Sequence, residues 1–72
     1  MTSNDRKKDH KSLGIQFRKE RERQGLTQTQ VAKASEVGIN YYAQIERGEV
    51  NPSYEIMRSI AKALKMKSLD IK

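Results

Sequence analysis

The sequence predicts an all-α fold, a compact domain of four helices with residues for a fifth. Three observations support this prediction. Apolar residues recur at spacings of three and four, which is the period of an amphipathic helix. Capping residues and glycines separate the periodic stretches. No stretch alternates apolar and polar residues, as a half-buried strand does.

The composition indicates one small basic domain. The chain has 72 residues and a net charge of +6, which favours a polyanionic partner, DNA before RNA or an anionic membrane surface. There is no cysteine, which excludes disulfides and thiolate metal sites and fits a cytoplasmic protein. No apolar run approaches the ~18 residues of a membrane span, and no apolar segment of a signal peptide follows the N-terminal charges. We therefore expect no membrane association.

Residues 1–11 are polar and lack an apolar period, so we expect them to form a flexible basic arm. The pattern changes at Ser12, and we expect residues 12–72 to form the folded domain. Leu13 and Phe17 lie four apart, and Arg21 continues the same face of a helix predicted over 12–24. Ser12 is suited to cap this helix, and Gly25 to end it in the left-handed conformation.

Two short helices are expected next, over residues 28–35 and 39–47. Thr27 can cap the first of them, with Gln30 completing a capping box. Gly38 can cap the second helix without a side chain, and Gly48 closes it. Both helices are brief, and the turn that joins them is tight.

A fourth helix is predicted over residues 53–65. Pro52 disfavours helix at the residue before it, and Ser53 is a good N-cap. The apolar stripe of this helix comprises Ile56, Met57, Ile60, Ala61 and Leu64. Lys65 stands where a C-terminal glycine would be most favourable. Residues 68–72 could begin a fifth helix, with Ser68 as its cap.

Two short helices joined by a tight turn in a basic domain suggest a helix-turn-helix unit, formed by the second and third helices. The small Ala32 would let the third helix cross close to the second. Val37, Tyr42 and Ile45 would then face inward. The outward face of the third helix is uncharged and carries Ile39, Asn40, Ala43 and Gln44. Amides and small apolar groups can read base edges in the major groove.

The stretch "GLTQTQVAKASEVGINYYAQIERGEVNPS" resembles the Cro/phage-repressor helix-turn-helix family, also called XRE-like. "GLTQ", "IERG", "NPS" and the later "IAKAL" have the family's spacing, and the match covers residues 13–69. The resemblance implies a phage-repressor type of fold whose third helix enters the major groove. It also implies a sequence-specific transcriptional regulator, a repressor or an activator, that binds a palindromic operator as a homodimer.

Carried over by position, the resemblance assigns Gln28 to DNA contact at the start of the second helix. It makes Ile39, Asn40 and Gln44 the principal base readers. The full set of expected DNA-binding residues is Gln28, Gly38, Ile39, Asn40, Tyr41, Ala43, Gln44, Arg47, Asn51 and Ser53. Arg21 and Glu46 match a pair that forms a buried salt bridge between the first and third helices.

The chain departs from the family pattern at three positions. Glu36 replaces a turn glycine and must accept the left-handed conformation or shift the turn, at about 1 kcal/mol. Gly38 replaces a serine or threonine cap. Tyr42 replaces an aliphatic core residue, so we expect its ring to be buried and its hydroxyl to reach an edge of the core.

Other interpretations stay open for several residues. Gln28, Asn40 and Gln44 could be ordinary solvated side chains. Tyr41 could contact a phosphate or a base, or pack on the arm. The cluster Arg6, Lys7, Lys8 and Lys11 could wrap DNA or be a solvated tail.

A second function is also compatible with the sequence. The alternative to a DNA-binding regulator is a helix-turn-helix protein-interaction module, a bridging factor or antitoxin-like partner binder, and a further C-terminal region or protein partner is possible. No catalytic Ser-His-Asp set, phosphate loop or carboxylate pair can be assembled, so we expect no enzyme and no cofactor. His10 has no second ligand at suitable spacing, so we expect no metal site.

Overall fold

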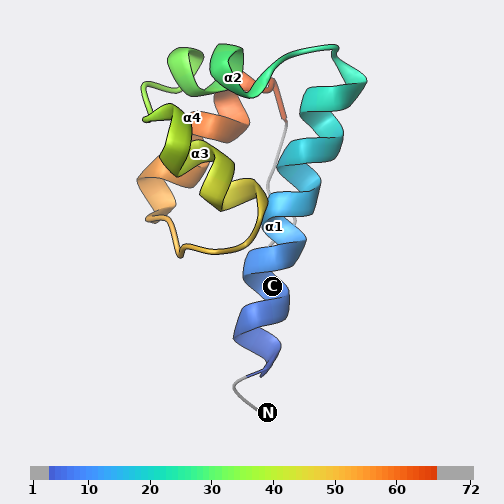
Figure 1. Cartoon of the computed structure of the whole chain (residues 1–72), viewed down its shortest axis with the longest axis vertical. Coiled ribbons are helices and arrows are strands. Elements are labelled where there is room, and N and C mark those ends of the chain that lie inside the picture. The colour runs from blue at the N-terminus through green and yellow to red at the C-terminus, as the bar shows by residue number, and fades with distance from the viewer. Residues whose placement is uncertain (1–3, 67–72) are drawn as a thin grey trace.

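The computed structural model describes residues 4–66 of the chain, and within that range it contains four helices and no strand (Figure 1). They are α1 (Asn4–Arg23), α2 (Gln28–Ala34), α3 (Ile39–Glu46) and α4 (Tyr54–Ala63). The predicted all-α class is confirmed, and the three later helices lie within about two residues of their predicted bounds. The possible fifth helix at 68–72 lies outside the described residues. None of the described helices is long and apolar enough to cross a membrane.

The start of α1 corrects the sequence-based prediction. The helix begins at Asn4 rather than Ser12, so residues 4–11 are helical where a flexible arm was expected, and Ser12 lies inside the helix instead of capping it. Residues 4–13 contain no glycine or proline, and lysine and arginine are good helix formers. The prediction relied on an apolar period, which these turns do not need because they project past the other helices (Figure 1).

All four helices end in the same way, with one residue in the left-handed conformation and a pair of backbone hydrogen bonds that close the last turn. Gly25 and Gly48 occupy this position after α1 and α3, at φ values of 71° and 72°. Glu36 and Lys65 occupy it after α2 and α4, at 59° and 57°. After α2, for example, the Val37 amide donates to the Ala32 carbonyl at 2.9 Å and the Glu36 amide to Lys33 at 3.2 Å. This is the Schellman motif, in which glycine is normally favoured.

The core is built where the four helices meet. Its buried members come from every helix: Leu13, Phe17, Val31, Ala32, Tyr42, Ile45, Ile60, Ala61 and Leu64. The predicted faces of α1 and α4 are therefore confirmed. Ile56 and Met57 pack on this core from its edge.

Tyr42 differs from its prediction in one respect. Its ring is buried as expected, but its hydroxyl is buried too and has no hydrogen-bond partner among the described residues, whereas we expected it to reach an edge. The ring projects from the middle of α3 into the centre of the core, so the hydroxyl ends inside it near Glu46. Burial, with the neighbouring Glu46 carboxylate, raises the pKa of Tyr42.

The backbones of α1 and α3 approach each other closely at Gly14, a contact that the sequence pattern does not indicate. A Cβ atom at this position would lie 2.4 Å from the Glu46 carbonyl oxygen and 2.5 Å from that of Ile45. The contact continues at Gly48, where an added Cβ would lie 3.0 Å from the Lys11 Cα. The first helix thus lies directly against the C-terminal end of α3, and only glycine permits this at position 14.

We expect Gly14→Ala to lower the free energy of unfolding by about 2 kcal/mol, because two backbone oxygens would have to move away from the new methyl group. Urea denaturation monitored by circular dichroism measures the change. Gly38→Ser is the matched control, since a Cβ there meets no atom within 4 Å and serine is a good N-cap. Equal stability of Gly14→Ala and the wild type would contradict the close approach.

Candidate nucleic-acid interface

The helix-turn-helix unit is α2, the turn at residues 35–38, and α3. The Thr27 hydroxyl accepts from the Gln30 amide at 3.1 Å, and the Gln30 side chain accepts from the Thr27 amide at 2.8 Å, so the predicted capping box is present. In the turn, the buried Ser35 hydroxyl donates to the Val31 carbonyl at 2.7 Å. These local bonds fix the direction in which the chain enters α3.

The α3 helix buries one face and exposes the other, as predicted. Tyr42 and Ile45 are buried in the core, while Ile39 and Asn40 are exposed. Ala43 and Gln44 are half-buried on the same outward side. Gly38 caps the helix without a side-chain hydrogen bond, so no cap side chain stands in front of the first turn. Tyr41 is also half-buried and packs on the core.

The remaining predicted site residues follow α3 along the chain. Arg47 is exposed, and its Nε donates to Glu49 at 2.8 Å. Asn51 is exposed in the connection to α4. Ser53 caps α4, its hydroxyl accepting from the Ile56 amide at 3.2 Å, and its own hydroxyl proton is left for another acceptor.

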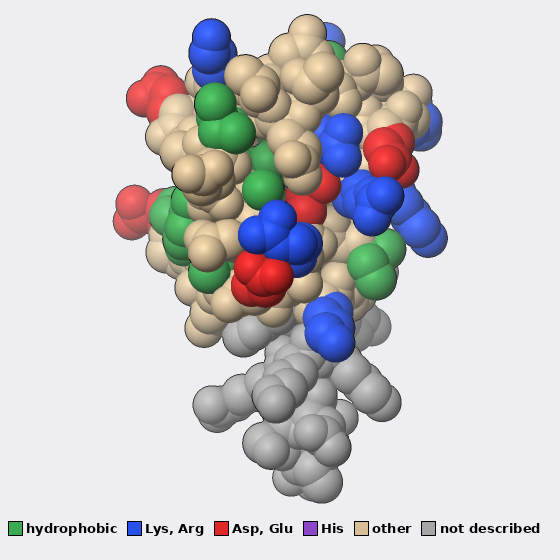
Figure 2. Space-filling view, viewed as in Figure 1, with side chains coloured by type: hydrophobic (Ala, Val, Ile, Leu, Met, Phe, Trp, Pro, Cys, Tyr) green, Lys and Arg blue, Asp and Glu red, His purple; other side chains and the backbone are tan. Residues whose placement is uncertain are grey.

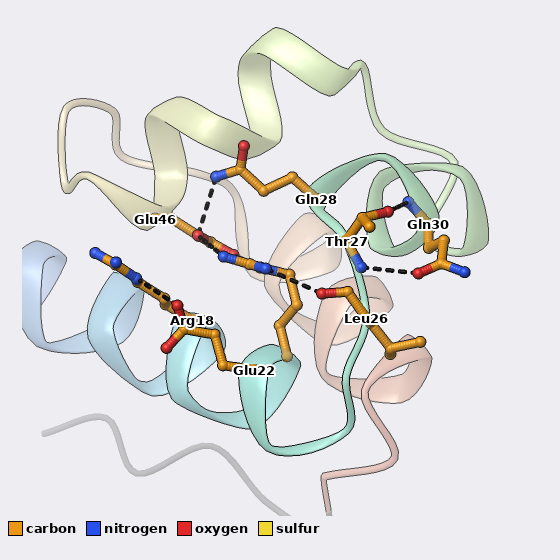
Figure 3. A network of polar contacts seen from close by, with 8 residues as sticks. Arg18, Glu22, Leu26, Thr27, Gln28, Gln30 and Glu46 are labelled. Carbon is orange, nitrogen blue, oxygen red and sulfur yellow. Dashed lines mark hydrogen bonds and ion pairs between the residues drawn. The ribbon is translucent and has the colours of Figure 1, made fainter.

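The carboxylate of Glu46 is the centre of a polar network that joins three segments (Figure 3). Arg21 of α1 donates to both carboxylate oxygens, from Nε at 2.7 Å and from Nη2 at 3.1 Å, which is the predicted ion pair. The Gln28 amide nitrogen, at the start of α2, donates to the same carboxylate at 3.1 Å. The side chains of Arg21 and Glu46 are only 13% and 3% exposed.

The pKa of Glu46 follows from these contacts. Burial alone would raise it, but the hydrogen bonds from Arg21 and Gln28 hold it below its ordinary value. The hydrogen bonds between Arg21 and Glu46 also raise the pKa of Arg21. Both groups are therefore charged at neutral pH, and the pair is a bidentate, charge-assisted one.

The contact between Gln28 and Glu46 was not predicted, and it defines how Gln28 is presented. A carboxylate only accepts hydrogen bonds, so the side-chain amide nitrogen of Gln28 must face Glu46 and the amide oxygen must face away, as Figure 3 shows.

Two further hydrogen bonds between distant or separate segments were also not predicted. Arg21 Nη1 donates to the Leu26 carbonyl at 3.0 Å, and the side-chain nitrogen of Gln24 donates to the Leu64 carbonyl at 2.6 Å. Donor and acceptor types alone could not choose these partners.

A depression in the surface lies beside this network, lined by Arg18, Arg21, Gln28, Glu46 and Arg47. Lys and Arg side chains gather on the face seen in Figure 2, toward α1 and the end of α3. Two of the lining arginines form exposed ion pairs: Arg18 with Glu22, and Arg47 with Glu49. Exposed pairs of this kind contribute little, so both guanidinium groups are available to an incoming anion.

A family model described as helix-turn-helix matches residues 17–72. This chain belongs to the helix-turn-helix family, of the XRE-like type that its sequence predicts. Over 48 residues this helix-turn-helix chain is 40% identical to YqaF of Bacillus subtilis, an uncharacterized HTH-type transcriptional regulator, covering 67% of this chain and 63% of that protein. Over 65 residues it is 40% identical to a probable translation initiation factor IF-2 of Methanocaldococcus jannaschii. That match covers 90% of this chain and 4% of the factor.

Two solved structures share the fold. The clp gene regulator ClgR of C. glutamicum superposes with a TM-score of 0.78 at 32% identity, covering 82% of this chain and 77% of that one. The restriction-modification controller protein C.AhdI of Aeromonas hydrophila superposes with a TM-score of 0.79 at 30% identity, covering 82% of this chain and 89% of that one. This chain therefore shares its family with a protein named as an HTH-type transcriptional regulator, and its fold with a gene regulator and a restriction-modification controller.

We expect Glu46→Ala to lower the free energy of unfolding by about 3 kcal/mol, because it leaves the nearly buried Arg21 guanidinium without its partner. Urea denaturation at pH 7 measures the loss. Glu22→Ala is the control: it removes a carboxylate from an ion pair whose side chains are 63% and 53% exposed, and should cost less than about 0.5 kcal/mol. Similar losses in the two variants would show that the Arg21–Glu46 pair is not buried in solution.

The same pair should make stability depend on pH in the acid range. The folded-state pKa of Glu46 lies below its ordinary value of 4.5, so its stabilisation is complete above that pH and is lost as pH falls through the folded-state pKa. Glu46→Gln cannot titrate, so its free energy of unfolding should fall less than that of the wild type between pH 7 and pH 3. Parallel curves for the two proteins would contradict this assignment. The pKa values of Glu20 and Glu49 are also lowered, but both proteins carry these residues, so their contribution to the pH dependence is the same in the two curves.

Proposed function

We propose that this chain is a sequence-specific transcriptional regulator that reads the major groove of DNA with α3. One observation carries the proposal: the outward face of α3 is uncharged and bears amides, although the domain around it is strongly basic. The opposite face of α3 is held in the core, and its C-terminal end is fixed by Arg21. A rigidly held helix with such a face suits contact with base edges.

Asn40 and Gln44 are the proposed readers of adenine. They lie four residues apart, so both side chains leave the same face of α3 and can reach neighbouring base pairs. Each amide offers a donor and an acceptor, which match N6 and N7 of adenine in a bidentate contact. Ile39 and Ala43 complete the reading face.

Phosphates are the proposed partners of the surrounding groups. Arg18 and Arg47 line the depression beside α3, and exchanging their exposed carboxylate partners for a DNA phosphate costs little. Gln28 keeps one amide hydrogen after its bond to Glu46, and Ser53 keeps its hydroxyl proton. Such contacts set register and affinity without selecting sequence.

The proposal extends to the assembly and its setting. We propose a homodimer on a near-palindromic operator, because a twofold-symmetric protein pair matches two half-sites about one helical turn apart. The basic turns at the start of α1, the expected arm, would add to the charge that attracts DNA. A cytoplasmic location and the lack of enzymatic activity belong to the same proposal.

We expect Gln44→Ala to weaken binding to the preferred duplex by about 1–3 kcal/mol and to scrambled DNA much less, since it removes a base contact. The preferred duplex comes from selection among random sequences. Fluorescence anisotropy titrations on both duplexes at matched salt give the two affinities. An equal loss on both duplexes would mean that α3 is not the reading element.

Two variants that remove one positive charge serve as controls. Arg47→Ala should weaken both duplexes alike and lower the log–log salt slope by about 1, because it removes a phosphate contact. Lys62→Ala, on the exposed side of α4, should change neither affinity appreciably. Binding that does not depend on salt would favour the protein-interaction alternative.

A further inference from the structure

The outward face of α3 has two edges of different chemistry. Asn40 and Gln44 form an amide edge, and Ile39 and Ala43, also four residues apart, form an apolar edge beside it. Ile39 is 45% exposed and is not among the side chains that pack on the core. Nearly half of this large apolar side chain is therefore open to a ligand on the outward face of α3.

We infer that Ile39 is a specificity-determining residue that contacts the 5-methyl group of a thymine in the major groove. That methyl group is the apolar feature among the base edges there, and isoleucine can make no hydrogen bond to the others. The inference rests on the proposed function and names what this part of the interface selects.

The two edges of α3 together fit A·T pairs. In the major groove such a pair presents N6 and N7 at the adenine end and the methyl group at the thymine end. An amide edge matches the first end and an apolar edge matches the second. Ala43 has a short side chain, so it leaves space beside Ile39 for the methyl group.

The start of α3 is open enough for this contact. Gly38 provides no side chain, and a Cβ there would meet no atom of the described residues within 4 Å. The neighbour of Ile39 one helical turn further on is the half-buried Ala43, so the exposed apolar surface around Ile39 is small. An apolar area of this size is far smaller than the contiguous patches that mark protein–protein interfaces, and its size is closer to that of one methyl group.

The test uses deoxyuridine, which differs from thymidine only in lacking the methyl group. Each thymine of the selected duplex is replaced in turn, and the affinity of the wild-type chain is measured for every duplex. At one thymine per half-site we expect a loss of roughly fourfold, the effect of one buried methyl group. Ile39→Ala should bind the thymine and uracil duplexes equally at that position.

Ile15→Ala is the matched control. Ile15 is 50% exposed on α1, so the variant removes the same atoms from another surface, and it should keep the wild-type preference for thymine. A second measurement replaces that T·A pair by C·G, with and without a methyl group at C5 of the cytosine. Methylation should improve binding by the wild type and not by Ile39→Ala.

Two results would overturn the inference: a wild type that is indifferent to every deoxyuridine, or an Ile39→Ala variant that keeps the full preference for thymine. In either case the loss of discrimination by Gln44→Ala would leave the proposed function standing. A chain that selects no sequence from the random pool would contradict both proposals. Thermal melts of Ile39→Ala and Ile15→Ala establish that both variants are folded during these measurements.

Discussion

The buried contact between Arg21 and Glu46 is the interaction on which the geometry of this domain depends. Glu46 is the last residue of α3, and its carboxylate receives hydrogen bonds from α1 and from the first residue of α2. The same guanidinium also holds the Leu26 carbonyl in the connection between those helices. A buried ion pair is weak evidence for net stability, because desolvation opposes the attraction. What it specifies here is position: it aligns the start of α2 with the end of α3.

The helices need this alignment because they cannot persist alone. The α2 and α3 helices have 7 and 8 residues, well below the ~12–15 at which isolated helices become even marginally stable. Their order comes from caps, from the nine buried apolar residues of the core cluster and from the close contact at Gly14. The shape presented by α3 is thus a property of the whole domain, and a change in α1 can reach the surface of α3 through the backbone.

Features that depend on neighbouring residues were predictable from the sequence. The Thr27 capping box, the Ser53 cap and the glycines at 25 and 48 all lie where their chemistry indicated, because caps are local. The ion pair of Arg21 and the family itself followed from the resemblance. The DNA contacts assigned to individual residues are still predictions.

Contacts between distant segments that the resemblance does not assign were not predictable. A glycine within a helix normally signals a cost, and nothing local shows that the end of α3 lies against Gly14. The partner of Gln28 was missed for the same reason, since Glu46 lies on another helix. The burial of the Tyr42 hydroxyl was missed because it depends on how the whole core packs around the ring. The helical start of α1 was missed because it projects from the domain and so leaves no apolar period in the sequence.

Two of the four helices end on a residue other than glycine, and this affects how easily the domain could evolve a new specificity. Glu36 and Lys65 hold a conformation that costs non-glycine residues about 1–2 kcal/mol, in motifs where glycine serves after α1 and α3. Glycine or asparagine at either position would recover part of that energy without altering the outward side chains of α3. Substitutions that retarget a recognition helix often destabilise it. Substitutions at Glu36 and Lys65, outside the reading face, could therefore restore the stability that a change of specificity in α3 costs.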